Sequence, residues 1–323
     1  EEYIQWIDMS KPHLYHLEVN LISTCNLKCK SCSHFSQLCK SPDIMKLEDF
    51  EDYMKRLSSI QIVNLYLLGG EPTLIKDLPE RFKIARKYFP DSTIAVLTNG
   101  TMLQQKDDTF YDSIRDNGIE IVLSLYPKYK HDEIKIRNFL IKKKVKFCIK
   151  RIITFIKTLT ENNNNDPFIS QTKCLCEQCR FLHTDGRIYK CPISKMGLLM
   201  NEEYGTKFPE SKSVTIEELV LNPSILDGPV EMCYYCSEKP KELNWKEYTF
   251  EDLGFPVTQT KSIRRTSKTI EVYNTGNWSA KEYLPMGLLR NEVADTGLLW
   301  QIEHNGSWHY EIADQNDHYI LNV

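Results

Sequence analysis

Short apolar runs alternate with amphipathic stretches over the first half of the chain. The runs, which are typical of buried strands, are Leu17–Ile22, Val63–Leu68, Thr93–Leu97, Ile119–Leu125 and Val145–Ile153. Between them, apolar residues recur at helical spacing, for example at Leu47, Phe50, Met54 and Leu57. Strands separated by helices of about 10–15 residues indicate βαβ units and a parallel sheet. The pattern therefore predicts an α/β fold, and it fits an open sheet and a partial barrel equally well.

The rest of the chain departs from this pattern in two steps. A run of asparagines, Asn162 to Asn165, indicates a loop and a boundary. Farther on, Leu298–Glu303 and Ser307–Ile312 flank Asn305-Gly306, a dipeptide typical of two-residue hairpin turns. We therefore expect three parts, which cover residues 1–160, 161–250 and 260–323.

Charge and length limit the classes of protein. The 323 residues carry 41 Lys and Arg against 44 Asp and Glu, a formal net charge of −3. Nucleic-acid-binding proteins usually carry a basic surplus, so we expect no nucleic-acid partner. No apolar run reaches the roughly 18–20 residues that span a bilayer, and the N-terminus lacks the pattern of a signal peptide. We therefore expect a cytoplasmic protein with no membrane partner. Because the sequence does not begin with Met, we also expect a processed chain or a fragment.

Eleven cysteines are the unusual feature of the composition. They are Cys25, Cys29, Cys32, Cys39, Cys148, Cys174, Cys176, Cys179, Cys191, Cys233 and Cys236. An odd number without a secretory signal argues against a disulfide framework, and tight clusters indicate metal. The thiolates of Cys25-x3-Cys29-x2-Cys32 fit three corners of a 4Fe–4S cluster and leave one iron without a protein ligand. The alternative is structural zinc, which needs four ligands, with Cys39 or His34 as the fourth.

Small and polar residues follow the predicted strands at the points where these end. They are Gly69-Gly70-Glu71-Pro72 after the second strand, Thr98-Asn99-Gly100 after the third, and Ser124 at the end of the fourth. Because the carboxyl ends of parallel strands share one face, we expect these residues to meet the cysteine loop there. Paired glycines allow a ligand to approach the backbone closely. Glu71 offers a carboxylate to a cationic amine, and Asn99 offers both a donor and an acceptor.

At these residues the sequence resembles the radical S-adenosylmethionine (SAM) enzymes. Cys25, Cys29 and Cys32 match the cluster motif of that family, and Gly69–Pro72 match its GGEP turn. Ser31 stands where the family usually has an aromatic residue. The resemblance implies a partial (β/α)6 TIM-like barrel in which SAM chelates the open iron of a 4Fe–4S cluster. It further implies cofactor contacts from Gly69, Gly70, Glu71, Thr98, Asn99 and Ser124.

The same resemblance implies an enzyme in the broad class of oxidoreductases. In that family the reduced cluster gives one electron to the sulfonium of SAM, and the resulting 5′-deoxyadenosyl radical abstracts hydrogen from a substrate. A reductant such as flavodoxin or ferredoxin is then an expected partner, and the expected substrate is a peptide, a protein or a glycan. The competing hypothesis is a non-catalytic binding scaffold that is stabilised by zinc or by an iron–sulfur cluster.

The second cysteine region resembles the auxiliary-cluster extension of some radical SAM enzymes, of the SPASM or shortened twitch type. The implied ligands of an auxiliary 4Fe–4S cluster are Cys191, Cys233 and Cys236, with Cys176 or Cys179 as the fourth. The full SPASM pattern continues with further cysteines, and none follows Cys236. This departure favours one auxiliary cluster rather than two.

The choice between Cys176 and Cys179 depends on a predicted hairpin. A two-residue turn at Asp185-Gly186 places Arg180 opposite Cys191. Because side chains alternate between faces along a strand, Cys176 then shares the face of Cys191, while Cys179 is nearer but points away unless a bulge intervenes, so the hairpin leaves the choice open. Zinc remains the alternative at this second site, since C-x2-C pairs suit tetrahedral thiolates.

Further expectations concern isolated residues. We expect Cys148 to be a buried strand thiol and Cys39 a spare loop thiol. The histidines include His13, His16 and His183, and no two of these have the spacing of metal ligands.

The end of the chain has a resemblance of its own. Residues from about 270 to 323, and Trp300–Trp308 in particular, resemble part of the N-terminal β-sandwich of the family 36 α-galactosidases. The catalytic carboxylates of that family belong to a separate barrel, so we expect no glycosidase activity. A fusion, a truncated reading frame and a sugar-binding appendage are equally compatible with this segment.

Overall fold

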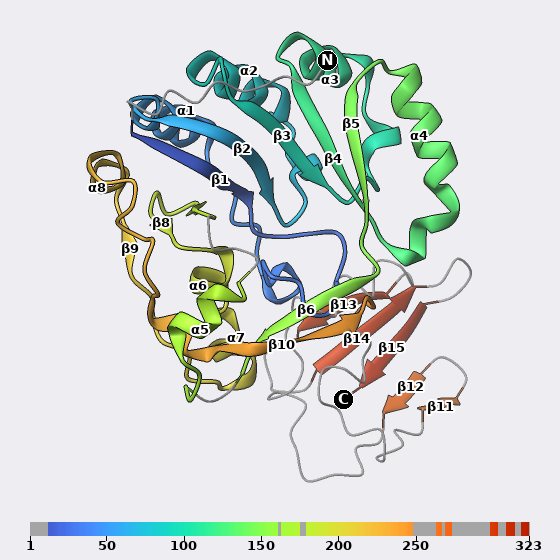
Figure 1. Cartoon of the computed structure of the whole chain (residues 1–323). Coiled ribbons are helices and arrows are strands. Elements are labelled where there is room, and N and C mark those ends of the chain that lie inside the picture. Colours follow the sequence, from blue (N-terminus) through green and yellow to red (C-terminus); the bar gives the residue numbers. More distant parts are fainter. Residues whose placement is uncertain are drawn as a thin grey trace. The chain divides into compact units, whose positions relative to one another are not determined.

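Five parallel strands alternate with four helices in the first part of the chain, as the apolar runs predict. The elements are β1 (His13–Ile22), α1 (Leu47–Leu57), β2 (Gln61–Gly69), α2 (Leu78–Tyr88), β3 (Thr93–Thr98), α3 (Asp108–Asp116), β4 (Ile119–Leu125), α4 (Glu133–Lys142) and β5 (Lys146–Arg151). Each strand pairs in parallel with the next one. The four helices lie along one face of this sheet (Figure 1). The predicted α/β partial barrel is confirmed.

The computed structural model describes residues 12–160, 163–174 and 179–247, together with five strands beyond residue 262. The chain divides into two compact units, Glu1–Glu247 and Tyr248–Val323. The barrel strands and the second cysteine region belong to the first of these units.

Alternation along β1 decides which side chains face the helices. Leu17 and Val19 are fully buried on the helical side, where Phe50 of α1 packs in the same core. Burying each such side chain stabilises the fold by roughly 1.5–3 kcal/mol. The intervening residues His16 and Glu18 therefore point to the opposite face of the sheet, which we call the open face.

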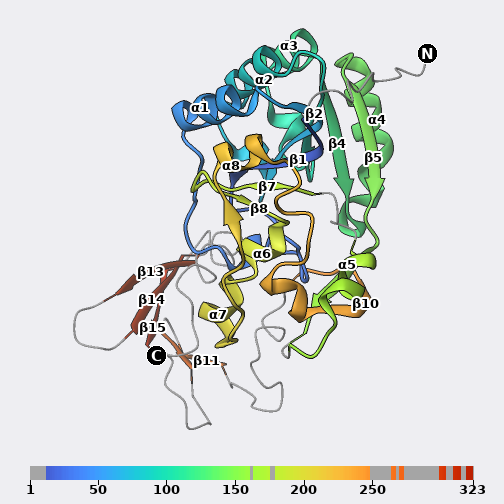
Figure 2. The same ribbon diagram turned by 60° about the vertical axis from the view of Figure 1, so that its left-hand side comes forward.

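After β5 the chain leaves the parallel sheet. β6 (Thr154–Leu159) pairs antiparallel with β10 (Cys236–Asn244) in a separate two-stranded sheet. α5 (Pro167–Thr172) begins after Asp166, whose carboxylate caps the helix, and it lies beside β10 (Figure 2). The chain that leaves the barrel is thereby joined to the second cysteine region.

Three short strands extend the main sheet on the other side of β1. They are β7 (Phe181–Leu182), β8 (Ile188–Tyr189) and β9 (Ser213–Val214), and the complete order is β5-β4-β3-β2-β1-β7-β8-β9. β7 runs parallel to β1, whereas β8 runs antiparallel to β7 and to β9. The short helices α6 (Pro192–Met196), α7 (Leu199–Tyr204) and α8 (Ile216–Leu221) complete this region.

The turn between β7 and β8 is one residue longer than predicted. Phe181 pairs with Tyr189, which shifts the register by one residue. The predicted pairing of Arg180 with Cys191 is therefore wrong. Gly186 adopts a φ of +76°, the left-handed conformation that three-residue hairpin turns need.

The second unit contains a five-stranded sheet. Its strands are β11 (Ile263–Thr266), β12 (Thr269–Val272), β13 (Leu298–Ile302), β14 (Trp308–Ala313) and β15 (His318–Asn322), in the order β11-β12-β15-β14-β13. β13 and β14 are antiparallel, with Ile302 opposite Trp308, so the predicted β-rich segment is confirmed. The Asn305-Gly306 turn itself lies outside the described residues. In the described part of the chain, no helix is both long and apolar enough to cross a membrane.

Candidate functional site

The cysteine loop that follows β1 meets the ends of β2 and β3. Asn99, at the end of β3, donates from Nδ2 to Asn26 Oδ1 at 2.8 Å and to Cys25 Sγ at 3.6 Å. At the end of β2, the backbone N–H of Glu71 donates to the carbonyl of Thr24 at 3.0 Å. The strand ends that were expected to converge therefore lie together, and the first cysteine of the loop lies among them.

Gly69 and Gly70 are required by the close approach of two backbone segments. A Cβ on Gly69 would lie 2.1 Å from the carbonyl oxygen of Ile22, and a Cβ on Gly70 would lie 2.0 Å from that of Thr24. The N–H of Gly70 donates to the Ile22 carbonyl at 2.6 Å. We expected these glycines to admit a ligand, but the space is taken by the start of the cysteine loop. The glycines thus determine where that loop begins.

The side chain of Glu71 connects the ends of β2 and β3. It is fully buried, and its carboxylate accepts hydrogen bonds from Thr73 N at 3.0 Å and Thr98 Oγ1 at 2.6 Å. Its other oxygen accepts from Asn99 N at 2.8 Å. Burial raises the pKa of Glu71, and these hydrogen bonds oppose that rise. Because both oxygens are engaged within the chain, the carboxylate holds the Thr98-Asn99 turn in place.

The three thiols of the loop have different surroundings. Burial raises the pKa of Cys25 well above its ordinary value. Burial also raises the pKa of Cys29 to about 12, although Trp245 Nε1 donates a hydrogen bond to its sulfur at 3.2 Å. Burial acts on Cys32 in the same direction, but the hydrogen bond and charge of His34 lower the pKa of Cys32 overall. Two of the three thiols are thus protonated at neutral pH until a cation displaces the proton, as is usual for thiolate ligands.

Aromatic residues from distant parts of the sequence lie beside this loop. Tyr126, just after β4, stacks on Trp245 with ring centroids 5.3 Å apart and on Phe155 with centroids 6.0 Å apart. The segment after β10 follows the loop, and the N–H of Lys30 donates to the carbonyl of Lys246 at 2.9 Å. Burial and the charges of the three loop cysteines raise the pKa of Tyr126. Sequence reasoning missed these aromatic residues because no spacing connects them to the cysteine motif.

Ser124 and Cys148 lie on the open face of the sheet. Ser124 of β4 pairs with Lys150 of β5. Phe147 and Ile149 of β5 pack toward the helices, so Cys148 points the other way. Cys148 is exposed, and the prediction of a buried thiol is wrong. The physical reason is that β5 is the edge strand of the sheet.

Four thiols share one neighbourhood in the second cysteine region. Burial raises the pKa of Cys236, and the nearby Cys191, Cys233 and Cys174 raise it further. Burial also raises the pKa of Cys191 to about 11, with a contribution from Cys174. The structure therefore brings Cys174, which was not predicted as a ligand, to the three predicted ligands.

Of the two residues proposed for the fourth ligand position, the structure describes only Cys179. Cys179 directs its thiol to Glu18 Oε1 at 3.9 Å, and Cys176 lies outside the described residues. Cys174 reaches the other thiols because it follows α5, which Ser170 fastens to β10 by donating from Oγ to the Cys236 carbonyl at 2.6 Å. Cys174 thus lies near the three other thiols, whereas the thiol of Cys179 faces Glu18.

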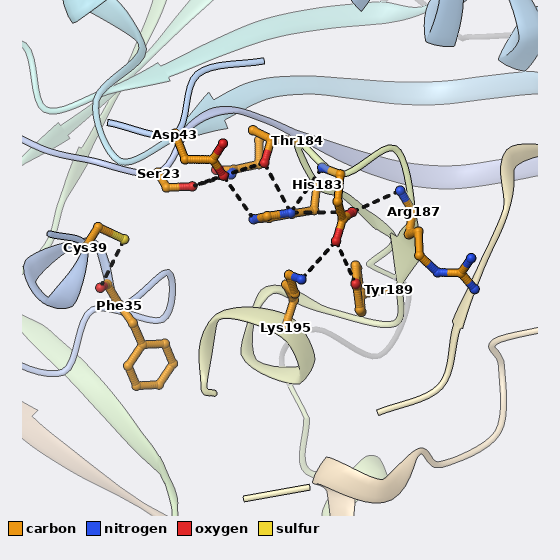
Figure 3. Close-up of polar contacts among 11 residues, drawn as sticks. Ser23, Phe35, Cys39, Asp43, His183, Thr184, Arg187, Tyr189 and Lys195 are labelled. Carbon is orange, nitrogen blue, oxygen red and sulfur yellow. Dashed lines mark hydrogen bonds and ion pairs between the residues drawn. The ribbon is translucent and has the colours of Figure 1, made fainter. Parts of the chain in front are cut away.

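A polar network holds the β7–β8 hairpin against the segment after β1 (Figure 3). Asp185, in the turn, pairs with Lys195 Nζ at 2.9 Å. Asp43 Oδ2 accepts from Ser23 Oγ at 3.3 Å and pairs with His183 Nε2 at 3.7 Å. Burial would raise the pKa of Asp185, but hydrogen bonds from His183 and Lys195 hold that pKa well below its ordinary range. Charged groups of this network therefore stabilise the contact between the β7–β8 hairpin and the segment after β1.

Comparison with known proteins identifies the class to which this site belongs. Residues 19–169 match the family model of the Radical SAM superfamily. This part of the chain therefore resembles a radical SAM domain, and that family implies a 4Fe–4S cluster and SAM. The predictions of a radical SAM domain and of an enzyme are confirmed.

Particular relatives match parts of the chain. A probable GTP 3′,8-cyclase of Pyrococcus abyssi is 33% identical over 107 residues, which are 33% of this chain and 33% of that protein. A GTP 3′,8-cyclase of Nautilia profundicola is 28% identical over 118 residues, which are 36% of each. The chain thus spans about a third of the length of these curated relatives.

Solved structures resemble a larger share of the chain. BtrN in complex with AdoMet and 2-DOIA has a TM-score of 0.45 and 16% identity, over 69% of this chain and 93% of that one. Streptococcus suis SuiB bound to S-adenosylmethionine has a TM-score of 0.41 and 12% identity, over 68% of this chain and 67% of that one.

Proposed function

We propose that the chain is a radical SAM enzyme that cleaves SAM reductively and abstracts hydrogen from a peptide, protein or carbohydrate substrate. The observation that carries the proposal is the contact between Cys25 and Asn99 at neighbouring strand ends of the radical SAM domain. Cys25, Cys29 and Cys32 are the proposed ligands of the cluster. When bound, the cluster supplies the electron that breaks the S–C5′ bond of SAM.

The spacing of the thiols supports an iron–sulfur cluster rather than zinc. Tetrahedral zinc with Zn–S bonds of about 2.3 Å brings its thiolates within about 4 Å of one another. Among the described residues, the group of three or more His, Cys, Asp and Glu side chains whose ligand atoms lie within 4.8 Å is His16, Glu18 and Cys179. The described cysteines form no such group of three, which favours a larger cluster over a single zinc ion.

The residues at the strand ends have distinct proposed roles toward SAM. Because both oxygens of Glu71 are engaged within the chain, the backbone carbonyls of the Gly69-Gly70 turn are the acceptors left for the methionyl amine. The amide of Asn99, already beside Cys25, would donate to the SAM carboxylate. Ser124 offers a hydroxyl on the open face, where the ribose would lie. In this arrangement Glu71 is a positioning residue that keeps the turn after β3 in register with the turn after β2.

The stacked rings of Tyr126 and Trp245 have a proposed role in shielding the cysteine loop from water. Trp245 and Tyr126 lie beside the cysteine loop, and the Trp245 N–H reaches Cys29. Bulky rings at this place exclude water from the reacting centre, and a dry site protects a reactive radical from side reactions. The N–H donor also stabilises negative charge on the sulfur of Cys29.

We further propose one auxiliary 4Fe–4S cluster, held by Cys174, Cys191, Cys233 and Cys236, in an extension of the SPASM or twitch type. The shared neighbourhood of these four thiols supports it. The proposed boundary between the barrel and this extension remains near residue 160, where β6 has left the parallel sheet.

Three features bear on the substrate class. The curated relatives are named for GTP, but the chain spans about a third of their length, so GTP belongs in a substrate panel rather than in the proposal. An auxiliary cluster favours a peptide or protein substrate, and the resemblance proposed from the sequence between residues from about 270 onward and a galactosidase β-sandwich favours a glycan. A reductant of the flavodoxin or ferredoxin type would supply the electron.

The first experiment is EPR spectroscopy of the anaerobically reconstituted, dithionite-reduced chain, with and without SAM. We expect a 4Fe–4S signal that shifts when SAM binds, and formation of 5′-deoxyadenosine. Cys29→Ala should abolish both, whereas Cys148→Ser, which changes an exposed thiol outside both cysteine groups, should leave them intact. A non-catalytic scaffold predicts a spectrum that is indifferent to SAM, and that result would overturn the proposal.

A further inference from the structure

We propose that His16, Glu18 and Cys179 form a zinc site on the open face of the barrel, separate from both cysteine groups. Their ligand atoms all lie within 4.8 Å of one another. His16 Nε2 lies 3.4 Å from Glu18 Oε1, and Cys179 Sγ lies 3.9 Å from the same oxygen. Tetrahedral zinc with bonds of about 2.0–2.3 Å separates its ligand atoms by roughly 3.3–3.8 Å. The three donors are therefore spaced to hold one ion.

The sheet register brings these residues together. His16 and Glu18 are two positions apart on β1, so they share a face. β7 runs parallel to β1 and pairs Phe181 with Glu18, and continuing that register by two residues places Cys179 beside His16. The N–H of Glu18 donates to the carbonyl of Arg180 at 2.8 Å, which anchors the start of β7. The backbone register thus places the three side chains next to one another on the open face.

Buried polar atoms in and beside this cluster form ion-pair contacts but no hydrogen bond. In the described part of the chain, His16 Nε2, Glu18 Oε2 and His34 Nε2 are buried and accept or donate no hydrogen bond. The side chains of His16 and Glu18 are 20% and 13% exposed, and Cys179 is 8% exposed. Buried polar groups without partners are uncommon in folded proteins, and a bound ion or water is a common explanation.

The donor set selects the metal. Imidazole, carboxylate and thiolate are the three ligand types that Zn²⁺ takes in proteins, whereas Ca²⁺ and Mg²⁺ prefer oxygen. The carboxylate of Glu18 and the thiolate of Cys179 together balance the charge of the ion. Three protein ligands leave a fourth position for water or for a donor atom of the substrate.

Neighbouring side chains orient the proposed ligands. The Tyr66 ring packs edge-on against His16 with centroids 4.5 Å apart. His34 Nε2 lies 3.8 Å from Glu18 Oε2, the carboxylate oxygen that the other two donors do not face. Such outer contacts fix the orientation of metal ligands.

Metal content and zinc K-edge X-ray absorption test this proposal, which does not rest on the proposed function. The full chain is reconstituted anaerobically with iron and sulfide in the presence of zinc, passed over a weak chelator, and analysed for zinc and iron per chain. We expect one zinc ion per chain with mixed N/O ligands and a single sulfur at about 2.3 Å. His16→Gln, Glu18→Gln and Cys179→Ser should each lose the zinc and keep the iron.

Two matched controls lie on the same open face outside the cluster. Glu120, which pairs with Lys146 at 3.2 Å, is changed to Gln, and the exposed Cys148 is changed to Ser. Both variants should keep zinc and iron at the level of the unchanged chain.

Several outcomes would overturn the zinc site. If Cys179→Ser loses iron instead of zinc, Cys179 is a cluster ligand. The proposal would also be overturned if zinc were coordinated by sulfur alone, or if a chain fully loaded with iron contained no zinc. Both results are obtained with the unchanged chain and need no variant. Failure of the EPR signal to respond to SAM, with zinc retained, would refute the proposed function and leave the zinc site standing.

Discussion

Replacing Gly70 with alanine tests whether the site depends on the close approach of two backbone segments. The added Cβ would lie 2.0 Å from the carbonyl oxygen of Thr24 and 2.8 Å from the N of Cys25. Favourable contact distances are about 3.5–4.0 Å, so the segments must separate by about 1.5 Å, and no side-chain rotamer can relieve a clash with backbone atoms.

The separation breaks two backbone hydrogen bonds. These run from Gly70 N to the Ile22 carbonyl at 2.6 Å and from Glu71 N to the Thr24 carbonyl at 3.0 Å. At about 1 kcal/mol each, their loss lowers the free energy of unfolding by about 2 kcal/mol. For a unit of this size the unfolding midpoint should fall by about 4–8 °C. Because Thr24 precedes Cys25, the same displacement moves a proposed cluster ligand, and the reconstituted variant should bind less iron.

Gly228→Ala is the matched control for this variant. A Cβ on Gly228 meets no atom within 4 Å, so alanine there should be neutral or stabilise the fold by up to about 1 kcal/mol. The assay is thermal unfolding of the metal-free chain, followed by iron analysis after reconstitution. Equal unfolding midpoints and equal iron contents for Gly70→Ala and Gly228→Ala would refute the reasoning.

Three further variants test other parts of the site. Trp245→Phe keeps the aromatic stack but removes the N–H that donates to Cys29 Sγ at 3.2 Å. The reduction potential of the cluster proposed at Cys25, Cys29 and Cys32 should therefore fall, as measured by an EPR-monitored redox titration. An unchanged potential would contradict the assigned contact. Cys174→Ser should reduce iron per chain by the content of the auxiliary cluster and leave the SAM-dependent EPR shift intact, and full iron loading would argue against Cys174 as a ligand. Asp185→Asn removes a carboxylate whose pKa is lowered by folding, so the variant should be less stable than the unchanged chain at neutral pH. The difference in unfolding midpoint between the two proteins should shrink as pH falls below about 4, where the carboxylate becomes protonated in the unfolded chain. A difference that is constant down to about pH 3 would contradict this linkage.

The meeting of Cys25, Glu71 and Asn99 was predictable from the sequence because it follows from one property of parallel sheets. Once the apolar runs are taken as parallel strands, residues that follow neighbouring strands must lie at one edge. The role of Glu71 was not predictable in the same way. A carboxylate that follows a strand can bind an amine or accept hydrogen bonds from backbone N–H groups. Glu71 is fully buried and accepts from the backbone N–H of Asn99, which favours the role of hydrogen-bond acceptor.

Contacts between residues that lie far apart in the sequence could not be predicted from the sequence alone. Trp245 reaches Cys29 because β10 pairs with β6 and its end returns along the cysteine loop. Neither residue type nor spacing signals a contact of this kind. The exposure of Cys148 was missed for a related reason, because an apolar run does not reveal that its strand is the edge of the sheet.

The assignment of Cys179 shows how much depends on a single residue in a turn. With a two-residue turn, alternation along β7 turns Cys179 away from Cys191 unless a bulge intervenes, so the predicted hairpin leaves both Cys176 and Cys179 as candidate ligands. The structure has a three-residue turn, but the ladder between β7 and β8 has only two pairs, so pairing with β8 does not decide where Cys179 points. Pairing with β1 decides instead, and it places the thiol against Glu18. Cys179, one of the two residues that the sequence offers as the fourth cluster ligand, is therefore placed to complete the proposed zinc site with two residues of β1, about 160 residues away in the chain.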